Sequence, residues 1–132
     1  MSSIFSKIIN RELPGFFIYE DDVCVAILDI SPAVPGQTLI IPKQEVDYIG
    51  RLDEDTYLHL MKISRKIAKA LDQTFSTLRT CYVIEGFEVP HVHIKLYPMT
   101  SDEIPLGKIL PSGQMAESDE LEKIVSAIKA NL

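Results

Sequence analysis

The stretch Val89-Pro-His-Val-His-Ile-Lys-Leu-Tyr-Pro98 holds two of the three histidines of this 132-residue chain. Polar and apolar residues alternate from His91 onward, and side chains in a strand alternate between two faces. The spacing therefore predicts a strand over 91–97 with His91, His93, Lys95 and Tyr97 on one face. The other face is apolar and suits a core; it consists of Val92, Ile94 and Leu96. Any half-solvated strand has a polar face, but two imidazoles beside an ammonium favour a functional site.

The elements around this strand follow from hydrophobic spacing and turn residues. Further strands are expected at 16–19, 23–29, 38–41 and 79–84, and helices at 4–10, 53–75 and 118–131. The connection between 79–84 and 91–97 is too short for a parallel crossover, so these two strands should pair antiparallel. We expect one α+β domain over 1–132: a mainly antiparallel five-stranded sheet with helices on one side, including a long helix and a C-terminal helix.

Composition excludes several classes of protein. Hydrophobic residues make up 46% of the chain, enough for a core, and the longest apolar run, Val23 to Leu28, is too short to span a membrane. The net charge of −6 argues against binding to duplex nucleic acid, which needs a basic surface. Cys24 and Cys81 lie in apolar runs, and no signal peptide is evident. A cytoplasmic location is therefore expected.

Three chemistries are compatible with the two histidines of the 91–97 strand. They could bind a metal ion with a third ligand such as Glu85 or Glu88. A neutral imidazole could act as a nucleophile towards phosphorus, with Lys95 stabilising negative charge. The strand could also bind an anion without any reaction.

Five segments, in this order, resemble landmarks of the histidine triad (HIT) family of nucleotide hydrolases and transferases. They are Ile4-Phe-Ser-Lys-Ile-Ile, Tyr19-Glu-Asp, Ala26-Ile-Leu-Asp-Ile-Ser-Pro, Pro35-Gly-Gln-Thr-Leu-Ile-Ile-Pro-Lys43 and Val89-Pro-His-Val-His. The resemblance covers nearly the whole chain and implies a HIT-like fold. It also implies a homodimer in which two sheets join through strand and helix.

The resemblance assigns a role to each candidate residue. His93 would attack the α-phosphorus of a nucleotide, and His91 would help to orient its ring. Asp29 would bind ribose hydroxyls, and Lys95 and Gln37 would lie on the phosphate side. An apolar pocket for the base would be formed by Phe5, Ile8, Ile27, Ile30 and Leu39.

The chain also departs from the family. Lys95 replaces the third histidine, Gln37 replaces a histidine after Pro-Gly, and Glu88 stands near the expected phosphate site, where its charge is unfavourable unless it turns away or pairs with Lys95. Many bacterial members bind a structural zinc ion through two cysteines and a histidine. The corresponding positions here are Ser3, Ser6 and Glu45. Serine hydroxyls are poor zinc ligands, so neither a metal nor another cofactor is expected.

Two functions remain in view. The first is a nucleotide hydrolase or nucleotidyl transferase that acts on a purine nucleotide derivative through a histidine nucleophile. The alternative is a HIT-like protein that binds a nucleotide with little or no catalysis and serves as a sensor or an assembly partner. The substitutions at Lys95 and Glu88 favour the alternative.

Overall fold

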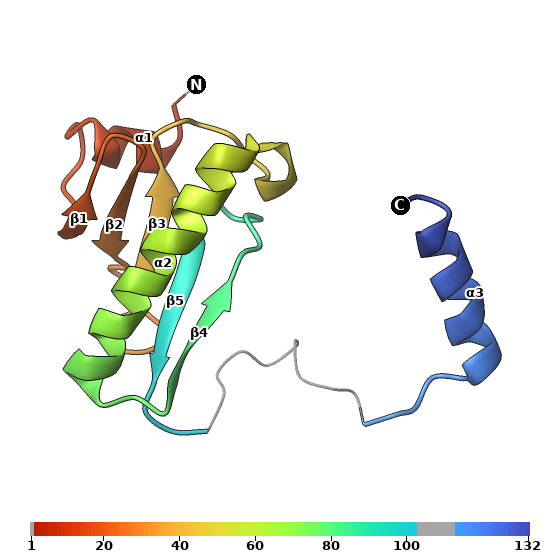
Figure 1. Ribbon diagram of the computed structural model, residues 1–132. Coiled ribbons are helices and arrows are strands. Elements are labelled where there is room, and N and C mark those ends of the chain that lie inside the picture. The colour runs from red at the N-terminus through yellow and green to blue at the C-terminus, as the bar shows by residue number, and fades with distance from the viewer. Residues whose placement is uncertain (1, 103–112) are drawn as a thin grey trace.

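The computed structural model describes residues 2–102 and 113–132. Its five strands are β1 (Phe17–Glu20), β2 (Cys24–Leu28), β3 (Thr38–Pro42), β4 (Arg79–Val83) and β5 (Ile94–Met99). They form one sheet in the order β1-β2-β3-β5-β4, and every neighbouring pair is antiparallel. The helices are α1 (Ile4–Ile9), the short 3-10 helix η1 (Ile49–Arg51), α2 (Glu54–Phe75) and α3 (Ser118–Lys129). The expected α+β architecture is confirmed (Figure 1).

Helix α2 forms where the sequence predicts it. The Asp53 side chain caps its first turn by accepting a hydrogen bond from the Thr56 N–H over 3.0 Å, and Glu54 and Asp55 add negative charge near the N-terminal end of the helix dipole. Its buried stripe, at three- and four-residue spacing, consists of Leu60, Ile63, Ser64, Ile67, Ala68 and Leu71. This stripe packs on the sheet beside Ile94 and Leu96.

The helices do not all lie on one side of the sheet, which corrects the expectation. Helix α2 packs with Cys24, Ala26 and Ile40, whereas α1 packs with the alternate residues of the same strands. Those alternate residues are Val25, Ile27, Leu39 and Ile41, which contact Phe5 of α1. Because β2 and β3 are continuous apolar runs, both faces of the sheet need cover.

Strand β5 begins three residues later than expected and runs two residues further. The ladder between β3 and β5 joins only Ile94–Leu96 to residues 38–40, so His91 and His93 precede the strand. Pro98 is accommodated because β3 no longer pairs with β5 beyond Leu96, where only β4 does.

Asp21 connects the β1–β2 hairpin to α2. Its Oδ2 lies 2.7 Å from His59 Nε2 and accepts a hydrogen bond from the Tyr19 hydroxyl, while Oδ1 accepts from the N–H groups of Val23 and Cys24. Burial would raise the pKa of Asp21, but these hydrogen bonds outweigh it and hold the pKa well below the ordinary value. The thiol of Cys24 lies near both groups, yet burial raises its pKa to about 12. The hydrogen bonds of Asp21 thus join the β1–β2 hairpin to α2.

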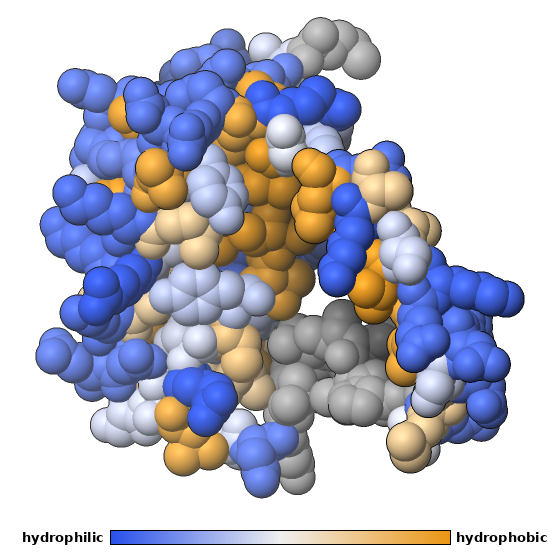
Figure 2. Space-filling model, turned by 45° about the vertical axis from the view of Figure 1, so that its right-hand side comes forward, coloured by the Kyte–Doolittle hydropathy of each residue, from blue (hydrophilic) through white to orange (hydrophobic). Residues whose placement is uncertain are grey.

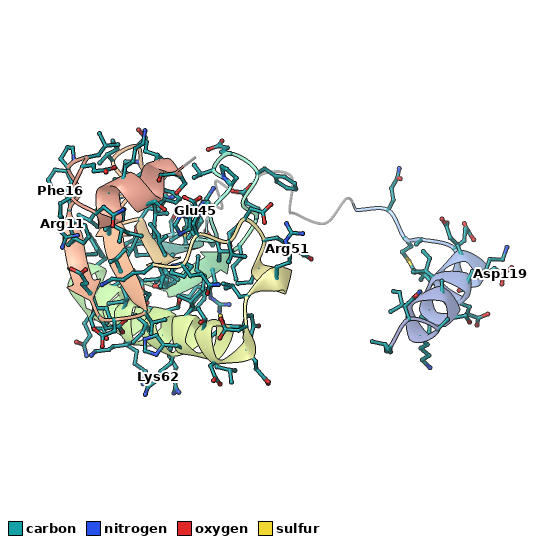
Figure 3. All side chains as sticks on the ribbon, turned by 90° about the horizontal axis from the view of Figure 1, so that it is seen from above. Arg11, Phe16, Glu45, Arg51, Lys62 and Asp119 are labelled. Atoms are coloured by element: carbon teal, nitrogen blue, oxygen red, sulfur yellow. The ribbon has the colours of Figure 1, made fainter. Side chains whose placement is uncertain are left out.

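Helix α3 lies apart from the sheet, and all of its residues are exposed (Figures 1 and 3). Its expected apolar stripe is present and each member is roughly half exposed: Leu121, Ile124, Val125 and Ile128. Among the described residues, no helix is long and apolar enough to cross a membrane.

Gly36 fixes the turn between β2 and β3 against the C-terminal end of α2. Its φ of +86° favours glycine, and a Cβ there would lie 2.4 Å from the ring of Phe75. Gly36→Ala should lower the free energy of unfolding by about 2–4 kcal/mol, combining left-handed strain with overpacking. Urea denaturation measures this loss.

Gly86→Ala is the matched control. Gly86 has a φ of +70°, but its Cβ would meet no atom closer than 3.6 Å. Its cost should be limited to about 1–2 kcal/mol of backbone strain. Equal losses in the two variants would show that contact with Phe75 is unimportant.

Candidate active site

His91 is a completely buried imidazole whose two nitrogens are both hydrogen-bonded. Nε2 lies 2.8 Å from the carbonyl oxygen of Pro42, so it carries the proton and donates. Nδ1 must then accept, and the Ser3 hydroxyl donates to it over 2.6 Å. Burial lowers the pKa of His91. The ring is therefore neutral at pH 7, with a fixed tautomer and orientation.

His93 donates through the other ring nitrogen from that used by His91. Its Nδ1 donates to the carbonyl oxygen of His91 over 2.8 Å, which leaves the lone pair on Nε2. The ring is nearly buried and packs edge-on against Phe5, with the ring centroids 4.9 Å apart. An imidazole held in this orientation, with Nδ1 as the hydrogen-bond donor and Nε2 as the basic nitrogen, suits a nucleophile.

Lys95 shares the face of His93 but is already paired. Its Nζ lies 2.9 Å from Oε1 of Glu85, whose Oε2 accepts a hydrogen bond from the Phe87 N–H over 3.0 Å. Burial alone would lower the pKa of Lys95, yet Glu85 raises it above the ordinary value. The same pairing lowers the pKa of Glu85. Glu88, the residue expected to pair with Lys95 or turn away, is exposed.

The importance of Glu85 was missed by sequence reasoning, which considered it only as a metal ligand. Glu85 and His93 line the same small hollow beside η1, together with Asp47 and Tyr48. A carboxylate in an otherwise unremarkable turn gives no sequence signal. Only the pairing of β4 with β5, which places Val83 opposite Lys95, brings Glu85 within reach of the ammonium.

A second hollow, of about 110 Å³, lies between α1 and the sheet. It is lined by all six residues that the resemblance assigned to the base and the ribose: Phe5, Ile8, Ile27, Asp29, Ile30 and Leu39. Four further lining residues were not expected: Ile4, Pro14, Gly15 and Leu28. A Cβ at Gly15 would lie 2.6 Å from the side chain of Ile8, so this position favours glycine. The Pro14-Gly15 pair was the sequence feature that could have indicated this close approach between the backbone and α1. Phe5 belongs to this wall and also touches His93, so the hollow adjoins the imidazole.

Gln37, which was expected on the phosphate side, is hydrogen-bonded to Asp29 of this hollow. Its Nε2 donates to Oδ2 of Asp29 over 3.0 Å, and its Oε1 accepts from the Ala33 N–H over 2.7 Å. Both ends of the amide therefore have a hydrogen-bond partner.

The three residues at which the resemblance implied zinc ligands gather around His91. Oε1 of Glu45 accepts from the Ser3 N–H over 2.5 Å and from the Ser6 hydroxyl over 2.7 Å, and Figure 3 shows Glu45 beside the start of α1. Neither hydroxyl is an adequate zinc ligand, and both already take part in hydrogen bonds, that of Ser3 with His91 and that of Ser6 with Glu45. The donor set does not fit zinc. It forms instead a polar network that joins α1, the end of β3 and His91.

Comparisons with known proteins found a matching family model, similar sequences and similar solved structures. Residues 10–101 match the family model described as the HIT domain. An uncharacterized HIT-like protein of Borreliella burgdorferi is 37% identical over 72% of this chain and 73% of its own length. Adenosine 5'-monophosphoramidase HNT1 of Saccharomyces cerevisiae is 33% identical over 98% of this chain and 82% of its own. The crystal structure of a HIT family protein from Bacillus anthracis superposes with a TM-score of 0.84 at 30% identity, covering 98% of this chain and 96% of that one.

Ser3→Ala should destabilise the protein by about 2 kcal/mol, because it leaves Nδ1 of His91 as a buried acceptor without a donor and also removes the cap of α1. Ser6→Ala is the matched control. Its hydroxyl bonds mainly to the exposed Glu45 and lies 3.5 Å from His91, so its loss should cost under about 1 kcal/mol. Urea titration of both variants at pH 7 measures the difference, and equal costs would contradict the role given to Ser3.

Proposed function

Because this chain belongs to the HIT domain family, we propose that it is a nucleotide hydrolase or nucleotidyl transferase that acts at the α-phosphorus of a purine nucleotide derivative. The observation that carries the proposal is the hydrogen bond from His93 Nδ1 to the His91 carbonyl oxygen, which leaves Nε2 as the nucleophilic atom. The relatives named adenosine 5'-monophosphoramidase support adenosine as the nucleoside.

The proposed reaction has two displacements at phosphorus. Nε2 of His93 forms a bond to the α-phosphorus while the bond to the leaving group breaks, and the leaving group departs with the electron pair. Water then attacks the phosphorus of the nucleotidyl-histidine: a P–O bond forms, the bond from phosphorus to Nε2 breaks with its electron pair returning to Nε2, and the proton of the attacking water passes to solvent. In a transferase, the hydroxyl or amine of an acceptor takes the place of water.

The two hollows suit the two ends of such a substrate. The apolar hollow would bind the base, with Asp29 accepting hydrogen bonds from the ribose hydroxyls. The phosphate would lie between this hollow and Lys95, whose permanent charge stabilises an anionic phosphoryl group. The leaving group would then point to the hollow beside η1.

The ion pair of Lys95 with Glu85 also supports the alternative, a nucleotide-binding protein with little catalysis. Lys95 stays protonated at pH 7 and is poorly suited to delivering a proton to an amine leaving group. Glu85 moreover competes with a phosphate for the ammonium. The two functions predict different results for turnover but the same nucleotide binding.

We further propose a two-fold homodimer. Strand β4 lies at the edge of the sheet, with Leu78 and Tyr82 exposed, and Figure 2 shows hydrophobic residues gathered on the side of the body that faces α3. The half-exposed apolar stripe of α3 also needs a partner surface. The proposed compartment remains the cytoplasm, and both cysteines are free thiols.

His93→Ala should abolish turnover of adenosine phosphoramidate and diadenosine polyphosphates, because the attacking nitrogen is lost. Binding of adenosine 5′-monophosphate should change little. Chromatography of products and mass spectrometry of acid-quenched protein measure turnover and the nucleotidyl adduct. His59→Ala, on α2, is the control and should retain both. Full turnover in His93→Ala would exclude it as the nucleophile, whereas wild-type protein that binds without turnover would establish the alternative function.

Lys95→Ala should weaken binding of adenosine 5′-monophosphate by about 1.5–3 kcal/mol if the ammonium contacts the phosphate. Lys95→His should raise turnover of phosphoramidates by supplying a group that titrates near pH 7, while weakening anion binding. Glu85→Gln should strengthen phosphate binding, because it frees the ammonium. Calorimetry and steady-state kinetics measure these effects. If all three variants match the wild type, Lys95 does not face the ligand.

Light scattering at micromolar concentration should give about twice the 14.8 kDa mass of one chain. Replacing Leu78 by Glu on the flank of β4 should shift the population towards monomer, because a charge would then be buried in the interface. Replacing Leu13 by Glu is the control. Leu13 is also an exposed apolar residue, but it precedes β1, which lies at the opposite edge of the sheet from β4. A wild-type monomer would refute the dimer.

A further inference from the structure

Gln37 is one of few buried polar side chains in the described part of the chain, with 4% of its surface exposed. The backbone N–H of Ala33 can only donate, so the amide atom that faces it over 2.7 Å is the oxygen. The NH₂ group must then face Asp29, where it donates to Oδ2 over 3.0 Å. The hydrogen bonds thus fix which way round the amide lies.

The same residue holds Asp29 through its backbone as well. The carbonyl oxygen of Gln37 accepts a hydrogen bond from the Asp29 N–H over 2.9 Å, across the start of the β2–β3 connection. The other carboxylate oxygen of Asp29, Oδ1, accepts from the Ser31 N–H over 2.8 Å. Three hydrogen bonds therefore define where this carboxylate lies, and Gln37 makes two of them.

A carboxylate has about four acceptor positions, and Gln37 and Ser31 occupy two of those of Asp29. Asp29 lines the apolar hollow between α1 and the sheet, and within residues 2–102 and 113–132 its carboxylate has no other hydrogen-bond partner, so its remaining positions face a ligand there. Two neighbouring hydroxyl groups, each donating to one oxygen, would complete the set. A vicinal diol fits this requirement, whereas a single hydroxyl leaves one position unused.

We propose that Gln37 is a positioning residue that makes the site selective for ribonucleotides over 2′-deoxyribonucleotides. This inference rests on the proposed function, because it takes the ligand of the hollow to be a nucleotide. Gln37 acts through Asp29 and does not touch the substrate. By holding the carboxylate in a single orientation, it lets both ribose hydroxyls donate at once without further ordering on binding. Each hydrogen bond from a hydroxyl to a charged group is worth about tenfold or more in affinity.

The test is calorimetric titration of the full chain with adenosine 5′-monophosphate and with its 2′-deoxy analogue. The wild type should bind the ribonucleotide about tenfold more tightly. Gln37→Met, which has a similar shape and no polar atoms, should reduce this preference to about twofold or less. The loss should fall on the ribonucleotide, with binding of the deoxy ligand nearly unchanged. This split separates a positioning role from a general loss of structure, which would weaken both ligands.

Two further variants sharpen the result. Gln37→Glu keeps the acceptor for Ala33 but sets a second carboxylate against Asp29, so it should abolish the preference even if the methionine variant folds poorly. Gln73→Glu is the matched control, because Gln73 is an exposed glutamine of α2, and it should behave as the wild type. Asp29→Asn by itself should remove the preference for the ribonucleotide. Adding Gln37→Met to Asp29→Asn should have no further effect on it.

The possible failures are distinguishable. A wild type that binds both sugars equally, or Gln37 variants that keep the tenfold preference, would overturn this inference and leave the proposed nucleotide site in place. Binding of neither sugar would overturn both. Binding with the expected preference but without turnover would support the inference while removing catalysis from the proposed function.

Discussion

The hydrogen bond from His91 Nε2 to the carbonyl oxygen of Pro42 is the interaction on which the geometry of the site depends. Pro42 ends β3, and its carbonyl fixes which nitrogen of the buried ring carries the proton. The other nitrogen must then accept, and the Ser3 hydroxyl at the start of α1 provides the donor. The ring therefore joins α1, β3 and the segment that leads into β5, and a proton on both nitrogens would break this arrangement. With His91 held in this way, its own carbonyl oxygen is in place to orient His93.

The polar network around His91 holds this part of the site together by hydrogen bonds and not by zinc coordination. Ser3, Ser6 and Glu45, the positions where the family resemblance implied zinc ligands, are joined to one another and to the imidazole by hydrogen bonds. A network of this kind is strong only when every member is satisfied. Both nitrogens of His91 have a hydrogen-bond partner, and the burial of the ring keeps water from competing for them.

The ion pair between Lys95 and Glu85 sets the electrostatics next to the candidate nucleophile. Because each residue shifts the pKa of the other towards the charged form, both remain ionised at neutral pH. The site therefore has a permanent cation, together with a carboxylate that partly neutralises it. This balance favours binding of a phosphoryl group over proton transfer to a leaving group.

The sequence alone determined the elements and the sides on which side chains lie, because both follow from local periodicity. The three- and four-residue spacing placed α2 to within a residue at its start, and the alternation after His91 put His93 and Lys95 on one face. The landmarks that resemble the HIT family also identified six of the ten residues that line the apolar hollow. Only the tertiary structure decided the partners: Glu85 for Lys95, Asp29 for Gln37, and Ser3 for His91. Each of these pairs joins residues that are 8 to 88 positions apart. Strand pairing and the packing of α1 bring them together. No local pattern of the sequence specifies which two polar groups will form a hydrogen bond after both are buried.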